Sequence, residues 1–369
     1  MPLGVEVTTS TAPAARGAYS QTDTLFLAGD WSAGSEVPVL VRSIADVEVS
    51  FADRSGDEAL WDYLDVFFRE GGRRAYVVKY DTGVDDALAL FTDDLGPGQV
   101  AAPSEANDAT TYGLLLDHAQ ANNRFALLDV DDDDDDAAMA TKAGLIPAEN
   151  NEYGALFGSW VAVPAPAGVV GGTERSVHAS AVIAALIARA DALGNPNRAA
   201  AGRDFPLQYA TGFAVVVTTG QRDTLLNAGC NTFALKLGVL QNYGFQTSVV
   251  QDVNTPFWQA NASRARMWLV SFAREIGEPY VFKNLDGKGR LARALQSDLD
   301  ALCLRLYNLD GLYGETPADA FVVEVGSAVN TIDDVAAGEL NAVVEVRFSL
   351  HAKRILIDLV SVPVTGVVS

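Results

Sequence analysis

The chain has 369 residues, 49% of them hydrophobic, which is enough for about two domains with substantial cores. Its 26 basic and 48 acidic residues give a formal net charge of −22, which indicates that the chain as a whole binds neither nucleic acid nor an anionic membrane. No stretch is long and apolar enough to span a membrane, and the first residues lack the basic and apolar regions of a signal peptide. We therefore expect a protein that is made and used in a cytoplasm, or released by lysis.

The cysteines and histidines do not suggest a metal centre. Cys230 and Cys303 are far apart in apolar contexts, which is typical of buried free thiols. The three histidines, His118, His178 and His351, are too scattered to form a metal cluster. We expect neither a metal nor a cofactor.

The N-terminal part begins with an extended segment. Residues 1–20 are rich in Thr, Ser, Ala and Pro, with Val5 and Val7 as a short alternating pair, so they are a poor core element and are expected to be an arm. Short buried strands follow at 24–29 and 37–41, and then a short helix at 43–51.

A clear amphipathic helix is predicted at residues 57–70. Gly71 and Gly72 end it, and residues 73–80 are predicted to form the next strand. Its apolar residues recur at helical spacing, namely Leu60, Trp61, Leu64, Phe67 and Phe68.

The next region contains the feature that most favours an enzymatic function. Residues 81–103 are acidic and predicted to be mostly loop, whereas a helix through Tyr112 leads to an apolar strand at 124–130. In many α/β enzymes the carboxyl end of such a strand carries the catalytic group, which makes Asp129 a candidate catalytic residue of a hydrolase. The sequence shows no second catalytic partner for it.

Six consecutive carboxylates, Asp131 to Asp136, follow directly. The run lacks the alternation, glycine and closing Glu of a calcium loop, so we predict a solvated outer loop, with weak cation binding as the alternative.

The residue types of a second catalytic arrangement also occur in the sequence. Residues 153–164 form an aromatic strand, and 176–180 open a strongly apolar helix that ends near residue 193. Ser180, His178 and Asp191 are the residue types of a hydrolytic triad, but no nucleophile elbow surrounds the serine. Packing and helix capping are the favoured roles.

Two long helices are predicted at residues 255–276 and 290–307. The charged residues from 264 to 293 sum to +4, although the whole chain is strongly acidic. One interpretation is surface charge balanced by acidic neighbours in the fold, and the other is a basic face for an acidic partner. The candidate residues are Arg264, Arg266, Lys283, Lys288, Arg290 and Arg293.

The last fifty residues carry the strongest pattern. Residues 320–325 predict a strand, and 340–350 alternate almost strictly between apolar and polar, which predicts an antiparallel strand with one buried face. Residues 355–362 are apolar on both faces at the chain end. They are either the last core strand of their own domain or a strand donated to the sheet of a neighbouring subunit.

The segment AFVVEVGSAVNTIDDVAAGELNAVVEVRFSLHAKRILIDLVSVPV resembles the C-terminal region of contractile tail sheath proteins of phages and phage-like injection machines. In that family a strand A-F-x-V is followed by N-T-x-x-x-x-x-G-x-L, an alternating strand, a turn and a hydrophobic terminal strand. Residues 21–80 also resemble the family, best at F-F-x-x-G-G-x-x-A-Y-V-V. The family's W-G-x-R-T-L pattern is absent from residues 238–245.

The resemblance implies a multi-domain, mixed α/β (α+β) fold. It implies arms at 1–20 and 353–369, a discontinuous inner domain from 21–80 and 215–352, and an outer insertion domain at 81–214. The arms would add strands to the sheets of neighbouring subunits. The arm residues concerned are Val5, Val7, Ile355, Ile357, Leu359, Val360 and Val362.

The resemblance also implies a structural, non-enzymatic role. Family members form hexameric rings that stack helically around a tail tube and contract to drive it through a host envelope, as in genome ejection. The implied partners are other copies of the chain, the tube protein, and the baseplate and tail terminator proteins, in a virion tail assembled in the host cytoplasm. The basic residues from 264 to 293 would face the tube. The alternatives are an α/β hydrolase-like enzyme using Asp129 and a generic self-assembling shell protein.

Overall fold

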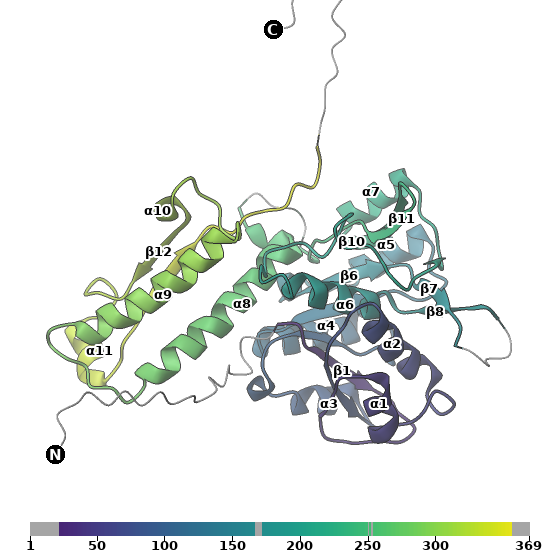
Figure 1. Ribbon diagram of the computed structural model, residues 1–369, viewed down its shortest axis with the longest axis horizontal. Helices are drawn as coiled ribbons and strands as arrows, with labels where there is room; N and C mark the ends of the chain where they lie inside the picture. Colours follow the sequence, from purple (N-terminus) through teal and green to yellow (C-terminus); the bar gives the residue numbers. More distant parts are fainter. Residues whose placement is uncertain (1–21, 167–171, 250, 252–253, 356–369) are drawn as a thin grey trace, which may run out of the picture.

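The computed structural model describes residues 22–166, 172–249, 251 and 254–355. An α/β core and a smaller helical lobe lie side by side (Figure 1). None of the described helices is long and apolar enough to cross a membrane.

The core is built on one sheet, which has eight strands in the described part of the chain, in the order β11-β10-β6-β5-β4-β1-β3-β2. The six inner strands run parallel, and the edge strands β2 and β11 are antiparallel to their neighbours. The strands are β1 (Leu25–Gly29), β2 (Val39–Val41), β3 (Ala75–Lys79), β4 (Gln99–Ala101), β5 (Phe125–Asp129), β6 (Gly154–Gly158), β10 (Cys230–Lys236) and β11 (Val239–Asn242).

Helices cover both faces of this sheet, as expected for parallel strands that are apolar on both sides. On one face α1, α2 and α6 form a large apolar cluster, and on the other face α3, α4, α5 and α7 form a second cluster. The helices are α1 (Ile44–Ser50), α2 (Glu58–Arg69), α3 (Val84–Leu90), α4 (Ala109–Ala121), α5 (Asp136–Gly144), α6 (Ala179–Asp191) and α7 (Thr219–Asn227), with 3-10 turns η2 (Asp93–Leu95) and η3 (Asn151–Tyr153).

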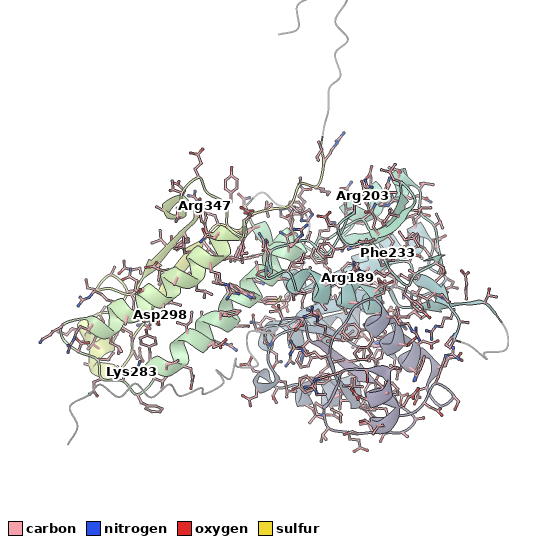
Figure 2. All side chains as sticks on the ribbon, viewed as in Figure 1. Arg189, Arg203, Phe233, Lys283, Asp298 and Arg347 are labelled. Carbon is pink, nitrogen blue, oxygen red and sulfur yellow. The ribbon has the colours of Figure 1, made fainter. Side chains whose placement is uncertain are left out.

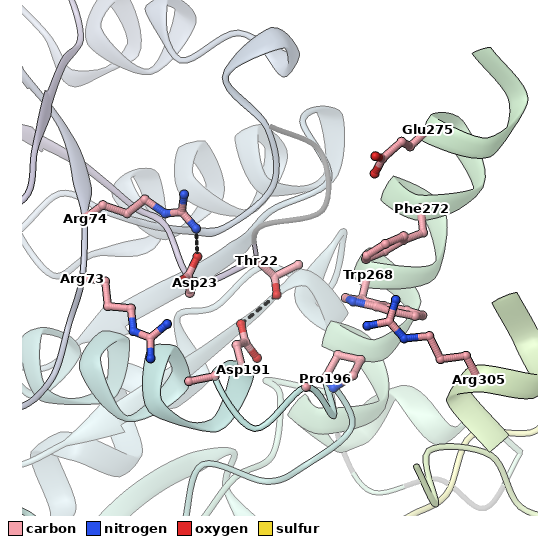
Figure 3. Close-up of a pocket in the computed structure, with 12 residues that line it drawn as sticks. Thr22, Asp23, Arg73, Arg74, Asp191, Pro196, Trp268, Phe272, Glu275 and Arg305 are labelled. Carbon is pink, nitrogen blue, oxygen red and sulfur yellow. Dashed lines mark hydrogen bonds and ion pairs between the residues drawn. The ribbon is translucent and has the colours of Figure 1, made fainter. Parts of the chain in front are cut away.

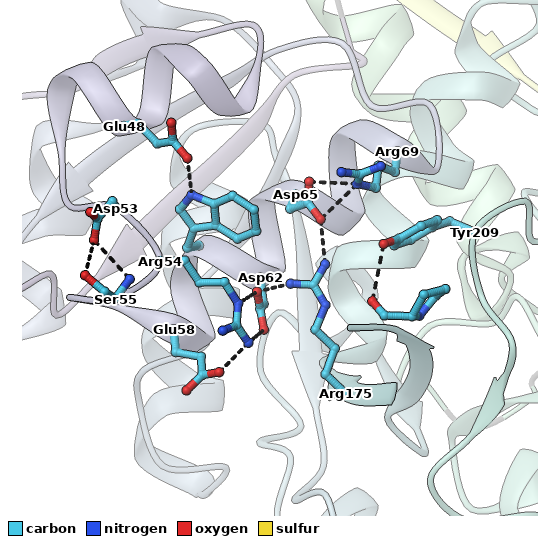
Figure 4. Close-up of polar contacts among 12 residues, drawn as sticks. Glu48, Asp53, Arg54, Ser55, Glu58, Asp62, Asp65, Arg69, Arg175 and Tyr209 are labelled. Carbon is cyan, nitrogen blue, oxygen red and sulfur yellow. Dashed lines mark hydrogen bonds and ion pairs between the residues drawn. The ribbon is translucent and has the colours of Figure 1, made fainter. Parts of the chain in front are cut away.

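A small sheet in the order β8-β7-β9 packs beside α2, and it consists of β7 (Val161–Pro164), β8 (Glu174–Val177) and β9 (Gly212–Phe213). Arg175 on β8 forms ion pairs with both Asp62 and Asp65 of α2 (Figure 4). Arg54 pairs with Asp62 and Arg69 with Asp65, so each buried carboxylate has two cationic partners. This network attaches the small sheet to the core.

The helical lobe consists of two long helices packed against a two-stranded sheet. The sheet pairs β12 and β13 antiparallel, with Val323 opposite Val344. The apolar core of the helical lobe includes Trp268, Leu302 and Phe348. The elements are η4 (Pro256–Trp258), α8 (Ala260–Gly277), η5 (Glu278–Tyr280), α9 (Arg290–Asn308), α10 (Pro317–Ala320), β12 (Phe321–Glu324), α11 (Ile332–Ala337) and β13 (Val343–Val346).

Several predicted elements are corrected. Residues 81–103 contain helix α3 and strand β4 rather than mostly loop. The aromatic strand predicted at 153–164 is two strands in different sheets, because the chain turns at Ser159, where φ is 63°. Of the alternating strand predicted at 340–350, only Val343–Val346 is in a ladder, and Leu350 is 48% exposed.

The core sheet does not divide at the domain boundaries expected from the sequence. It takes strands from 21–80, from 81–214 and from 215–352 alike. The structurally separate unit is the helical lobe, which begins at η4 and ends around residue 350. Which surfaces lie inside or outside a helical assembly stays a prediction.

Candidate functional site: surfaces for assembly

The two-stranded sheet of the helical lobe has outer edges that pair with no further strand among the described residues. The Arg347 N–H donates to the Ala320 carbonyl at 2.9 Å, and continuing this register makes residues 345 and 343 the hydrogen-bonded positions. Val344 and Val346 therefore turn their backbone groups to the free edge of β13. Such an edge is a template for an incoming strand.

The expected arm strands lie almost wholly outside the described residues. Of the predicted arm residues, Ile355 is described, and it is 78% exposed and belongs to no strand. The remaining ones are Val5, Val7, Ile357, Leu359, Val360 and Val362, and their pairing stays a prediction.

A polar clamp holds the chain immediately before the C-terminal arm. The Gln259 amide group bonds the backbone of His351 in both directions, because its Nε2 donates to the His351 carbonyl at 3.0 Å and its Oε1 accepts from the His351 N–H at 2.8 Å. Asn197 Nδ2 donates to the Ser349 carbonyl at 2.8 Å. Asn261 joins the two parts, since its Nδ2 donates to Asn197 Oδ1 at 2.8 Å and its Oδ1 lies 2.9 Å from His351 Nδ1.

Burial, and secondarily the charge of Lys353, lowers the pKa of His351 to about 4. The imidazole is therefore neutral at neutral pH. No sequence pattern predicts this clamp, because no periodicity or motif marks Asn197, Gln259 and Asn261.

The six predicted basic residues fall into two groups. Arg264 is 3% exposed, and its Nη2 contacts both oxygens of Asp191 at 2.8 and 2.7 Å. Arg266 pairs with Glu152 at 2.8 Å and lies over the Tyr153 ring. These two cations are balanced by acidic neighbours inside the fold.

The other four basic residues, between 283 and 293, lie in the connection from α8 to α9 and at the start of α9. This connection is at the end of the helical lobe farthest from the core (Figure 1), where Figure 2 labels Lys283. Phe282 in this connection is fully exposed, with φ of 65°. This tip therefore presents an aromatic ring together with positive charge. The exposed basic residues are Lys283, Lys288, Arg290 and Arg293.

The Asp129 carboxylate accepts hydrogen bonds from the first turn of helix α6. It is 6% exposed, its Oδ1 accepts from the Ser180 N–H at 2.8 Å, and its Oδ2 accepts from the Ser180 hydroxyl. Tyr63 in turn donates to Ser180 Oγ at 2.9 Å. Burial raises the pKa of Asp129 to about 7, although the bonds from Ser180 oppose this. A carboxylate enclosed in this way offers no access to a substrate.

The proposed triad is not assembled. Ser180 bonds Asp129, whereas Asp191 pairs with Arg264 at the opposite end of α6. The His178 ring stacks on Trp160 with centroids 3.9 Å apart, and burial lowers its pKa to about 4. Packing and tertiary polar contacts are the observed roles, because the His178 side chain makes no capping hydrogen bond to α6.

The acidic run at 131–136 was predicted to be a solvated loop, but several of its carboxylates make specific contacts within the fold. Asp135 caps α5 by accepting from the Ala138 N–H at 2.9 Å, and Asp134 accepts from the Asp131 N–H at 2.9 Å. Lys142 pairs with Asp131 at 2.8 Å. The described residues contain no group of three or more potential ligands that could hold a metal ion.

A scan against models of protein families finds no match, and no curated protein matches the chain. Several solved structures match the chain. A chain of the anti-feeding prophage baseplate in its contracted state has a TM-score of 0.76 at 21% identity, covering 98% of each chain. The contracted PVC sheath complex of an extracellular contractile injection system has a TM-score of 0.76 at 16% identity, covering 98% of this chain and 97% of its own. The sheath tail protein of Desulfitobacterium hafniense has a TM-score of 0.58 at 12% identity, covering 87% and 93%.

These similarities extend over the core and the helical lobe together. The chain therefore has a mixed α/β fold of the kind found in assembled contractile machines. Its fold is that of the contractile sheath proteins, which confirms the predicted fold class and, at the level of the fold, the predicted resemblance.

Proposed function

We propose that this chain is a structural, non-enzymatic subunit of a contractile sheath. The observation that carries this proposal is the similarity of nearly the whole chain, in both directions of coverage, to sheath structures in the contracted state. The subunits form hexameric rings that stack helically around a tail tube, in a phage tail or a related injection particle. Contraction then drives the tube through the host envelope.

The sheet of β12 and β13 is the proposed receiving site for the arms. Among the described residues its two strands pair with no third strand, and the predicted C-terminal arm begins two residues after the clamp at His351. Strands from the arms of neighbouring subunits would complete the sheet and link the lattice. A strand at 355–362 is apolar on both faces in the sequence, and the sheet of a neighbouring subunit would supply partners for them.

The basic tip of the helical lobe is the proposed contact with the tube. Lys283, Lys288, Arg290 and Arg293 are exposed on a chain of net charge −22, so they form a local positive surface that suits an acidic partner. The baseplate and terminator proteins are proposed partners at the two ends of the sheath. Assembly takes place in the host cytoplasm.

Negative-stain microscopy of the purified chain, alone and with residues 353–369 deleted, tests the proposal. We expect hollow helical tubes from the full chain and folded, unassembled protein from the deletion. Folded monomers in both samples, over a range of salt concentrations that screens the acidic charge, would contradict it.

A further inference from the structure

A cleft of about 460 Å³ lies between the helical lobe and the α/β core (Figure 3). Trp268, Phe272 and Glu275 line it from α8, and Arg73 and Arg74 line it from the opposite side, just before β3. It differs from the assembly surfaces described above, because it lies within a single subunit.

The cleft contains polar groups that no described residue satisfies. Glu275 Oε2 is buried without a hydrogen-bond donor, and so is Arg74 Nε without an acceptor, within the described part of the chain. A buried carboxylate oxygen without a donor is unfavourable, so a cationic or hydroxyl donor is expected beside Glu275. The aromatic surface of Phe272 lies next to it along α8.

The chain itself enters this cleft. Thr22, the first described residue, forms part of the wall, where its hydroxyl donates to Asp191 Oδ2 at 2.7 Å and its carbonyl accepts from Gln99 Nε2 at 2.5 Å. Asp23 forms an ion pair with Arg74. These contacts fix where the preceding residues begin, since consecutive Cα atoms are about 3.8 Å apart.

The preceding segment has the length and the side chains to fill the cleft. Asp191, which holds Thr22, also pairs with Arg264, and Glu275 lies eleven residues farther along α8, or about 16 Å at the helical rise. The six residues 16–21 span about 20 Å when extended. Arg16 is the only basic residue of the first 21, and Tyr19 is the only aromatic one.

We infer that residues 16–21 bind in the cleft of their own subunit, with the Arg16 guanidinium on the Glu275 carboxylate and the Tyr19 ring against Phe272. Arg16 supplies the missing donor, and the bound segment directs the remaining arm residues toward the end of the cleft at Glu275. This inference goes beyond the proposed function, because it concerns the subunit before it assembles.

Limited trypsin digestion of the unassembled full chain tests the inference, since Arg16–Gly17 is the only trypsin site in the first 21 residues. Mass spectrometry follows cleavage at that bond, and a peptide of residues 10–22 gives the rate for an unbound segment. We expect cleavage in the protein to be slower than in the peptide. Glu275→Ala should accelerate it at least about tenfold, as expected for loss of a charge-assisted hydrogen bond.

Glu278→Ala is the matched control, because Glu278 begins the 3-10 turn η5 only three residues farther along the chain and is exposed. It should leave the rate unchanged. Tyr19→Ala should also accelerate cleavage relative to the same change in the peptide, and it alters none of the described residues. Equal rates in wild type, Glu275→Ala and the peptide would overturn the inference. Protection that disappears on dilution would also overturn it, because the segment would then bind a second copy.

Discussion

The Oδ1 atom of Asn261 on α8 lies 2.9 Å from Nδ1 of His351, the residue at which the chain leaves the helical lobe. The same asparagine donates to Asn197 of the core, so one side chain connects the core, the lobe and the base of the C-terminal arm. The clamp therefore attaches residue 351 to both the core and the lobe through polar side chains.

Asn261→Ala should weaken this anchor. Removal of the amide leaves Asn197 Oδ1 and His351 Nδ1 without their partner on α8, and we expect the free energy of unfolding to fall by about 1–3 kcal/mol. Hydrogen exchange should show faster exchange at the His351 amide. Asn284→Ala, at an exposed position, is the control and should change neither quantity. Unchanged exchange at residue 351 would show that Gln259, whose Oε1 accepts from the His351 N–H, holds this residue without Asn261.

Asp129→Asn tests the buried carboxyl through its pH dependence. The folded pKa of about 7 is above the ordinary value of 3.8, so the stability that Asp129 contributes when protonated is lost as the pH rises toward 7. Asparagine does not titrate and keeps an acceptor for the Ser180 N–H. The stability of the variant relative to wild type should therefore increase by about 2 kcal/mol between about pH 5 and 7.

The comparison uses the difference between the two proteins because His178 and His351 have lowered pKa values and act in the opposite direction. Their contribution is present above about pH 6.5 and is lost as the pH falls, equally in both proteins. A stability difference that does not vary with pH would contradict a raised pKa for Asp129.

Arg175→Ala should detach the small sheet from α2. Arg175 is buried between Asp62 and Asp65, and its loss leaves each carboxylate with one remaining arginine. We expect a loss of about 2–3 kcal/mol in a denaturant titration. Arg198→Ala removes a similar but exposed pair with Asp204 and should cost less than about 1 kcal/mol. Equal losses of stability in the two variants would show that the buried ion pairs of Arg175 contribute no more to stability than the exposed ion pair of Arg198.

Val344→Pro should block strand addition without unfolding the lobe. The Val344 N–H faces the free edge of β13, where proline is tolerated, whereas the Val343 N–H lies within the ladder with β12. We expect Val344→Pro to remain folded by circular dichroism and to form no tubes. Val343→Pro should lower the melting temperature instead. Normal tubes from Val344→Pro would place the incoming strand elsewhere.

The local patterns predicted the fold well where apolar residues have a clear period. The helix at α2 and the strands β1 and β3 are where the sequence places them. Strand β4 was missed because it has only three residues in an acidic region, and α5 was missed because its first turn lies in the aspartate run. The order of strands in the sheet depends on crossovers between distant segments, which no local pattern contains.

The site was less predictable for the same reason. Charge alone placed Arg264 and Lys283 in one group, but burial separates them, since Arg264 pairs with Asp191 from a helix 73 residues away. The clamp around Asn261 joins segments about 90 residues apart. A single sequence gives the residue types, and the tertiary contacts decide which of them meet.

The central claim, that subunits are linked by a donated C-terminal strand, is tested most directly by a disulfide between Leu359→Cys and Val344→Cys in the full chain. The native Cys230 and Cys303 are buried and should not interfere. Under mild oxidation we predict a ladder of covalent multimers on a non-reducing gel, which is absent when Asp132→Cys replaces Val344→Cys. A disulfide that forms only within single chains, or none at all, would contradict the account.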